Sequence, residues 1–143
     1  MSGKKHVVFI CTYNSVRSQM AEGILRHLYG DRFEVTSAGV APAGVHPMAI
    51  AVLRERGIDI SHQKSRSVMQ LRGQEFEYVV TLSDECKYKC TLPLQGKRNI
   101  HRPFQSPPEI ADDQNKVIEG FRSLRDEMWK FIEITFKPYV PQD

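Results

Sequence analysis

The stretch Val7–Glu22 reads VVFICTYNSVRSQMAE and decides how the rest of the chain is expected to fold. The four apolar residues before Cys11 are typical of a buried strand. From Ser18 to Tyr29 the apolar residues recur at helical spacing, and Gly30 follows as a residue that commonly ends a helix. This stretch therefore predicts a strand, a short loop and a helix, with Cys11 at the end of the strand.

The rest of the chain alternates between strand and helix patterns. Strands are expected at Lys5–Ile10, Phe33–Ser37, Phe76–Leu82 and Asn99–His101. Helices are expected at Ser18–Tyr29, Pro47–Arg56, Ser67–Leu71 and Val117–Phe136. Because such alternation builds right-handed βαβ units, we predict one three-layer α/β domain over residues 1–143. It should contain a central four-stranded parallel sheet with helices on both faces, and residues 137–143 should form a frayed tail.

Composition limits the classes of function. The chain has 143 residues, 41% of them hydrophobic and 26% charged, with a formal net charge of +3, which is typical of a soluble domain. Lysines and arginines are dispersed, so no nucleic acid is expected as a partner. With no apolar run of about 20 residues and no signal-peptide core, we expect a cytoplasmic protein without membrane contact. Three cysteines, an odd number, favour reactive thiols in a reducing compartment.

Cys11 and Arg17 are separated by five residues, and Ser18 follows directly. A loop between strand and helix can turn its N–H groups inward, and the positive helix N-terminus faces the same point. Arg17 adds planar bidentate donors, so the motif predicts a tetrahedral oxyanion held beside a thiolate nucleophile. The alternative is a structural cysteine near a surface arginine. The predicted oxyanion-binding residues besides Arg17 are Thr12, Tyr13, Asn14, Ser15, Val16 and Ser18.

Five stretches together resemble one known family over nearly the whole chain. They are CTYNSVRSQMAEG, SAGV, HPMAIAVLRERGIDIS, YVVTLSDEC and FRSLRDEM. In this order they resemble the low-molecular-weight protein tyrosine phosphatase superfamily, and more closely its thioredoxin-coupled arsenate reductase branch. The phosphatases usually have a proline after the Arg-Ser pair, whereas QMAE stands here and is similar to the reductases.

The resemblance implies a role for each residue of the loop. Cys11 corresponds to the nucleophile, Arg17 to the oxyanion clamp and Ser18 to the hydroxyl that stabilises the thiolate. Asn14 corresponds to the asparagine that holds the strained loop backbone, which asparagine tolerates better than most residues. Tyr13 departs from the common glycine, and we expect it to narrow or shield the mouth of the site.

Cys86 and Cys90 follow the strand that should border the Cys11 loop. Thiols close to the first one permit thiol–disulfide exchange. The resemblance implies a relay in which Cys11 attacks arsenate, a second cysteine releases arsenite, and a third closes a disulfide. Thioredoxin would then reduce that disulfide.

The match to this relay is incomplete. Cys90 stands at the family's third cysteine position, but Ser83 stands at the second, and Cys86 has no counterpart. The residues alone leave two alternatives, namely two buried structural cysteines or a partial zinc site with His62 or His101.

A residue expected for acid catalysis is missing. The family carries an Asp-Pro general acid late in the chain, whereas RPFQSPPE places Ser106 before Pro107. Loss of such an acid lowers the rate by about 10²–10⁴-fold and should impair phosphomonoester hydrolysis most. Candidates to replace it are Glu109, Asp112 and Asp113.

Some of these reductases also carry a cation site. Asn14, Glu22 and Ser37 match its ligands, but Arg66 stands where a carboxylate is expected. Either Arg66 places its own charge in the potassium position, or Glu22 and Arg66 are unrelated surface residues. We predict no metal and no cofactor.

The sequence thus predicts an arsenate reductase that uses Cys11 with a Cys86/Cys90 relay and thioredoxin. One alternative is a low-molecular-weight tyrosine phosphatase that forms a phosphocysteine on Cys11. Another is a degenerate oxyanion-binding regulatory module. All three share an arsenate or phosphate-like oxyanion as the ligand.

Overall fold

The strand that ends at Cys11 lies in the interior of the sheet. The computed structural model describes residues 3–84, 94–109 and 113–138. Its strands are β1 (Lys5–Cys11), β2 (Phe33–Gly39), β3 (Glu75–Thr81) and β4 (Gln95–His101). All pair in parallel in the order β2-β1-β3-β4, which confirms the predicted four-stranded parallel sheet.

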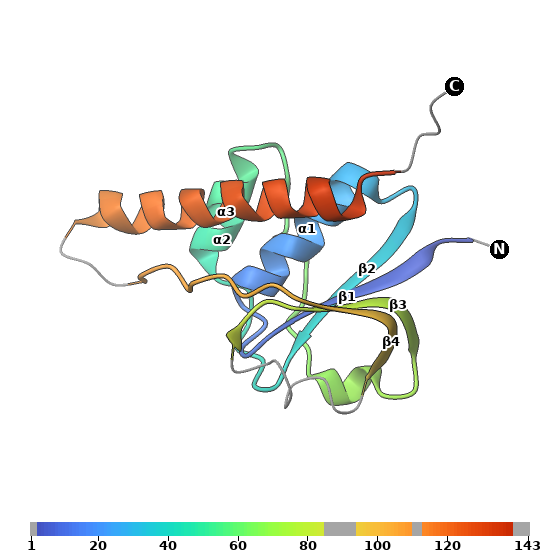
Figure 1. Ribbon diagram of the computed structural model, residues 1–143. Helices are drawn as coiled ribbons and strands as arrows, with labels where there is room; N and C mark the ends of the chain where they lie inside the picture. Colours follow the sequence, from blue (N-terminus) through green and yellow to red (C-terminus); the bar gives the residue numbers. More distant parts are fainter. Residues whose placement is uncertain (1–2, 85–93, 110–112, 139–143) are drawn as a thin grey trace, which may run out of the picture.

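Helices follow the strands in the predicted alternation. They are α1 (Arg17–Tyr29), α2 (Pro47–Arg54), the 3₁₀ helix η1 (Val68–Leu71) and α3 (Gln114–Phe136). Figure 1 shows α1, α2 and α3 together on one side of the sheet, with η1 on the other. The prediction of an α/β fold with helical cover on both faces is confirmed, although the opposite cover within the described residues is one 3₁₀ turn.

Strand β1 is buried on both faces. Val7, Val8, Phe9 and Ile10 are each 0% exposed, as expected of a parallel strand covered from both sides. Phe9 belongs to the larger core under the α-helices, whereas Ile10 belongs to the smaller core beneath η1. The run of four apolar residues therefore predicted the strand correctly, because each face has its own core to fill.

Several element boundaries differ from the prediction. Strand β4 begins at Gln95, because its pairing with β3 starts at Glu75 opposite Gln95. The prediction from Asn99 was too short, since an edge strand of polar residues lacks the apolar pattern that marks a buried one. Helix α3 begins at Gln114 because the Asp113 carboxylate caps it by accepting from the Asn115 N–H at 2.9 Å.

The strand order places a crevice at the carboxyl ends of β1 and β3. The chain leaves β1 for β2 on one side and later returns to β3 on the other, and ligands of such sheets bind at this switch point. Cys11 is the last residue of β1. The candidate site therefore lies where the topology predicts one.

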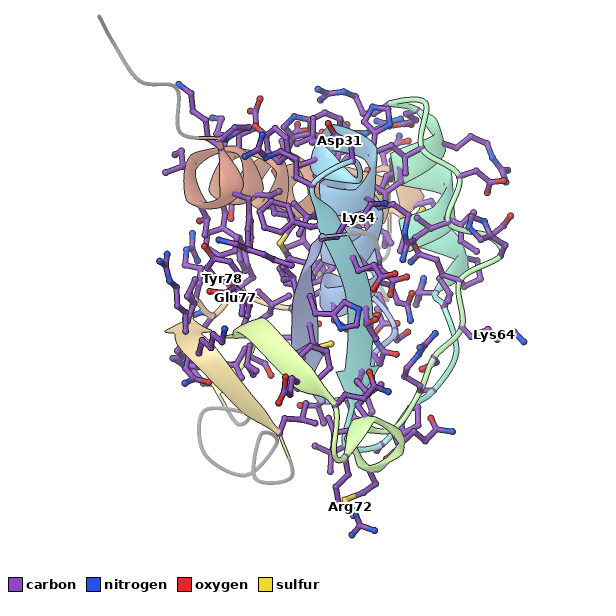
Figure 2. The ribbon with its side chains drawn as sticks, turned by 90° about the vertical axis from the view of Figure 1, so that its right-hand side faces the viewer. Lys4, Asp31, Lys64, Arg72, Glu77 and Tyr78 are labelled. Atoms are coloured by element: carbon purple, nitrogen blue, oxygen red, sulfur yellow. The ribbon has the colours of Figure 1, made fainter. Side chains whose placement is uncertain are left out.

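Glu22 and Arg125 are buried charged residues, whereas other charged side chains lie at the periphery of the molecule. In Figure 2, Lys64 and Arg72 project outward from different edges. Among the helices of the described ranges, none has the length and apolar character needed to cross a membrane.

Candidate active site

The loop between β1 and α1 is held by one buried asparagine. Asn14 is 0% exposed and has a φ of 47°, in the left-handed region that asparagine tolerates better than most residues. Its Nδ2 donates to Ser18 Oγ at 2.7 Å and to Ser37 Oγ at 2.9 Å. Its Oδ1 accepts from the Arg66 N–H at 2.9 Å. Asn14 thus connects the loop to α1, β2 and the 64–67 segment.

The carbonyls of the loop point toward a neighbouring segment. Thr12 O accepts from Ala41 N at 2.9 Å, and Tyr13 O accepts from Ala43 N at 3.0 Å. Ser15 O accepts from His46 N at 3.1 Å. Because a peptide unit is planar and trans, each outward carbonyl turns the next residue's N–H inward. This arrangement supplies the inward N–H groups that the motif predicts.

Gly39 permits the close approach of the loop to β2. A Cβ atom at Gly39 would lie 2.7 Å from Thr12 O and 2.8 Å from both Asn14 N and Cys11 O. These are backbone atoms and cannot rotate away. A glycine is therefore required here by the space available.

The Cys11 thiol is buried beside a serine hydroxyl. Cys11 is 2% exposed, and its Sγ lies 2.9 Å from Ser18 Oγ. Since Ser18 Oγ already accepts from Asn14, its own hydrogen is free to donate to the sulfur. Helix α1 has no side-chain cap at Val16, so its first N–H groups remain available to an anion.

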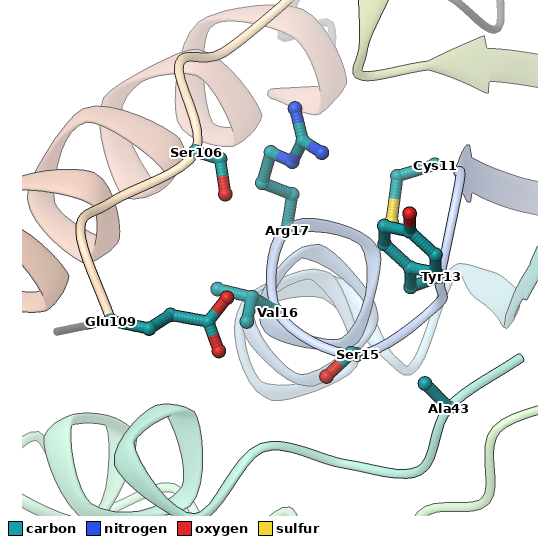
Figure 3. A pocket seen from close by; sticks show the side chains of 8 residues that line it. All are labelled: Cys11, Tyr13, Ser15, Val16, Arg17, Ala43, Ser106 and Glu109. Carbon is teal, nitrogen blue, oxygen red and sulfur yellow. The ribbon is translucent and has the colours of Figure 1, made fainter.

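A pocket of about 170 Å³ opens above the sulfur (Figure 3). This volume suits a small oxyanion rather than a drug-sized ligand, which needs about 300 Å³ or more. Arg17 forms part of the wall, and its Nη1 donates to Phe104 O at 3.0 Å, which fixes the guanidinium. The lining residues are Cys11, Tyr13, Ser15, Val16, Arg17, Ala43, Ser106 and Glu109.

The structure brings most of the predicted site residues together, in two layers. Tyr13, Ser15 and Val16 line the pocket, whereas Asn14 and Ser18 are buried beneath it. Thr12 belongs to the loop and uses its carbonyl to contact Ala41.

The second group of predicted residues is only partly described. Cys86 and Cys90 lie outside the described residues. Ser83, at the family's second cysteine position, is 0% exposed, and its hydroxyl has no hydrogen-bond partner within the described ranges.

At the residues that match the cation ligands of some reductases, an arginine of the chain supplies the positive charge. The Glu22 carboxylate is nearly buried; Oε1 accepts from Ser37 Oγ at 2.6 Å and Oε2 accepts from Arg26 Nη2 at 2.7 Å. The positive charge against Glu22 therefore comes from Arg26. Arg66 donates its backbone N–H to Asn14 instead, which favours the interpretation that Glu22 and Arg66 are unrelated. The expectation that Glu22 lies at the surface is wrong, because Glu22 is 4% exposed.

These residues do not fit a bound potassium ion. Both oxygens of the Glu22 carboxylate are already engaged, and a guanidinium supplies the charge. Arg26 is further fixed by donating to Gln63 Oε1 at 3.0 Å and to Val35 O at 2.9 Å.

The three candidates for a replacement acid have different positions. Glu109 lines the pocket, together with Ser106. Asp113 caps α3 and is thereby engaged with the Asn115 N–H. Asp112 lies outside the described residues.

Sequence reasoning missed His46, which contacts Glu109. Its Nε2 lies 2.8 Å from Glu109 Oε1, and its Nδ1 accepts from the Met48 N–H at 3.0 Å as the cap of α2. The available signal was its position directly before Pro47, which begins the helix.

Comparisons with known proteins agree with this geometry. Residues 6–131 match the family model of the low molecular weight phosphotyrosine protein phosphatases. A curated arsenate reductase of Halalkalibacterium halodurans is 38% identical over 130 residues, covering 91% of this chain and 94% of that protein.

Solved structures give the same family. A structure described as an arsenate reductase in oxidized state has a TM-score of 0.78 at 30% identity, covering 91% of this chain and 95% of that one. A thioredoxin-dependent arsenate reductase of Corynebacterium glutamicum has a TM-score of 0.62 at 31% identity, covering 94% of this chain and 64% of that one. The chain therefore belongs to the low-molecular-weight phosphotyrosine protein phosphatase family.

Proposed function

We propose that this protein is a cytoplasmic arsenate reductase in which Cys11 carries the arsenic and Cys86 and Cys90 supply the electrons. The observation that carries the proposal is the Cys11 thiol at the base of a small oxyanion pocket, beside Ser18 and Arg17. Similarity to arsenate reductases over about nine-tenths of the chain supports the choice of arsenate. Two further cysteines after β3 support a relay.

Binding of arsenate would use the loop and the helix together. The inward N–H groups of residues 12–16, the N-terminus of α1 and the Arg17 guanidinium would hold the oxygens. The Ser18 hydroxyl would stabilise the Cys11 thiolate, which attacks arsenic and displaces one oxygen as water. Arsenic remains pentavalent in this step, now bonded to sulfur.

Reduction would occur in the second step. The thiolate of Cys86 or Cys90 attacks Cys11 Sγ, forming an S–S bond as the S–As bond breaks, and arsenic leaves with the electron pair as arsenite. The remaining thiolate then displaces Cys11 and closes a Cys86–Cys90 disulfide. The enzyme has then lost two electrons, and the arsenic has gained two.

A dithiol must restore the reduced enzyme. We propose thioredoxin, because a similar solved protein is described as a thioredoxin-dependent arsenate reductase. Two-electron exchange between its dithiol and the Cys86–Cys90 disulfide returns both thiols.

The test is mass spectrometry after a single arsenate turnover without reductant. The expected product is a Cys86–Cys90 disulfide with one equivalent of arsenite. Cys11→Ser should give neither. Cys90→Ser should stop the relay at a disulfide that includes Cys11, and thioredoxin-dependent turnover should fall to background.

Two other results would replace this proposal. Hydrolysis of p-nitrophenyl phosphate through a phosphocysteine on Cys11, with no arsenite formed, would make the protein a phosphatase. If phosphate protects Cys11 against an alkylating reagent but neither substrate is turned over, the protein would be an oxyanion-binding module.

A further inference from the structure

Glu109 and His46 form a pair at the edge of the Cys11 pocket. Glu109 lines the pocket, and Figure 3 shows its carboxylate pointing inward toward Val16. On its other side, Glu109 Oε1 lies 2.8 Å from His46 Nε2. Glu109 therefore lines the pocket that an oxyanion on Cys11 would occupy, and His46 contacts Glu109.

The contacts of His46 fix both its tautomer and its orientation. Nδ1 accepts from the Met48 N–H at 3.0 Å, so the ring proton of the neutral form resides on Nε2. Nε2 therefore donates to Glu109. The ring lies 5.0 Å from that of Phe121, and the His46 backbone N–H binds Ser15 O. A turn of the ring would break the cap of α2, so Glu109 has a partner that cannot rotate freely.

We propose that Glu109 is the catalytic proton donor of this pocket and that His46 is its positioning residue. The inference rests on the proposed function for its substrate, arsenate. The expected acid position holds Ser106, whose neutral hydroxyl is too weak an acid to protonate a leaving oxygen at neutral pH. Glu109 lines the same pocket and carries a carboxyl group.

The step balances in atoms and charge. The Cys11 thiolate bonds to the arsenic of H₂AsO₄⁻, and one As–OH bond breaks. The leaving hydroxide takes the proton of Glu109 and departs as water, which leaves a Cys11–S–AsO₃H⁻ adduct and a Glu109 carboxylate. With an aryl phosphate, the same proton goes to the phenolate oxygen as the S–P bond forms.

The charges around Glu109 support this use. His46 donates to Glu109 and Arg17 lines the same pocket, whereas the Cys11 thiolate and the bound oxyanion are negative. A carboxylate and an oxyanion in one small pocket repel each other, and one shared proton removes that repulsion. Once the proton is transferred, the Nε2–H of His46 stabilises the new carboxylate.

The first experiment compares leaving groups in Glu109→Gln, using p-nitrophenyl phosphate and phenyl phosphate. Glutamine keeps the shape and the hydrogen bond but cannot donate a proton to the leaving oxygen. We expect kcat to fall about 10²–10⁴-fold for phenyl phosphate and by much less for p-nitrophenyl phosphate, whose phenolate leaves without a proton. Single-turnover arsenate reduction should slow by a similar factor. Glu133→Gln, on the exposed face of α3, is the matched control.

The second experiment tests the positioning role through a pH profile. His46→Asn keeps a side-chain oxygen to cap α2 but loses the contact with Glu109. We expect the alkaline limb of the kcat profile to shift in His46→Asn and to disappear in Glu109→Gln. In both variants, bound phosphate should still protect Cys11 against an alkylating reagent.

Equal slowing with both leaving groups, or an unchanged alkaline limb in Glu109→Gln, would overturn the inference while arsenate reduction stands. Aryl phosphate turnover with the predicted leaving-group effect but no arsenite would instead overturn the proposed function alone. A wild-type protein that turns over neither substrate would overturn both.

Discussion

The Ser18 hydroxyl lies 2.9 Å from the Cys11 sulfur and receives a 2.7 Å hydrogen bond from the Asn14 amide. Ser18 and Asn14 are 0% exposed and Cys11 is 2% exposed, so water does not compete for these bonds. Because the Asn14 amide donates to the Ser18 oxygen, the hydrogen of the Ser18 hydroxyl remains available to donate to the Cys11 thiolate.

Ser18→Ala should therefore slow the reaction of Cys11 near neutral pH. A hydrogen bond to a charged group contributes about 1.5–3 kcal/mol, which corresponds to a fall of roughly 10–100-fold. The measurement is the rate of alkylation by iodoacetamide as a function of pH, which should recover at alkaline pH. Ser123→Ala, exposed on α3, should match wild type. If Ser18→Ala were alkylated at the same rate as wild type at every pH, Ser18 would not stabilise the thiolate.

Gly39→Ala should displace the loop without removing any side chain that contacts the substrate. The added methyl would meet three backbone atoms at 2.7–2.8 Å, so the loop must move. We expect loss of protection of Cys11 by phosphate, together with a lower melting temperature. Gly120→Ala is the control, because its new methyl would meet only proline side chains, the nearest atom at 3.2 Å. If Gly39→Ala still bound phosphate, the close approach between Gly39 and the backbone of the Cys11 loop would not be required for the site.

Glu22 and Arg26 should behave as a coupled pair. Arg26→Met leaves a nearly buried carboxylate without its cation, and we expect a loss of about 1–3 kcal/mol in the free energy of unfolding, since Arg26 is partly exposed. Glu22→Gln in the Arg26→Met background should restore part of this loss, because the buried charge is gone. Urea denaturation of the single and double variants measures the coupling energy. Additive losses would show that the pair is not coupled.

The active-site loop, Arg26 and His46 show which features of the site could be predicted from the sequence and which could not. Cys11, Arg17 and Ser18 were predicted because their spacing within one strand–loop–helix unit is local. Arg26 follows Glu22 by four residues, a local spacing that was overlooked, whereas its partners Gln63 and Val35 come from distant segments that only the fold brings together. His46 was missed because its partner Glu109 is far from it in the chain.

Strands of polar residues set a second limit on how well the elements could be predicted from the sequence. Strand β4 carries the stretch QGKRNIH, and its pairing with β3 rather than its composition defines where it begins. By contrast, the apolar residues of β1 and the stripe of α3 predicted their elements well, because each fills a core.

Stability at acid pH should depend on Glu55, which joins α2 to α3. Hydrogen bonds from Arg122 at 2.7 Å and from Arg125 at 2.7 Å lower the pKa of Glu55 from 4.5 to about 2. Because the folded state holds the proton less tightly than the unfolded state, this stabilisation is complete above about pH 4.5 and fades as the pH falls toward about 2. Glu55 is 39% exposed, so solvent screening keeps the contribution near or below about 1 kcal/mol.

Glu55→Gln should therefore lower the free energy of unfolding at pH 7 by up to about 1 kcal/mol and have little effect near pH 2. The difference between wild type and variant should close between about pH 4.5 and 2, which urea denaturation across that range would measure. Glu119→Gln is the matched control, since Glu119 pairs with Arg122 within α3 at 70% exposure. Its effect should be smaller, because it does not join two helices. A stability difference for Glu55→Gln that stays constant down to pH 2 would show that the side chain acts through packing and not through its charge.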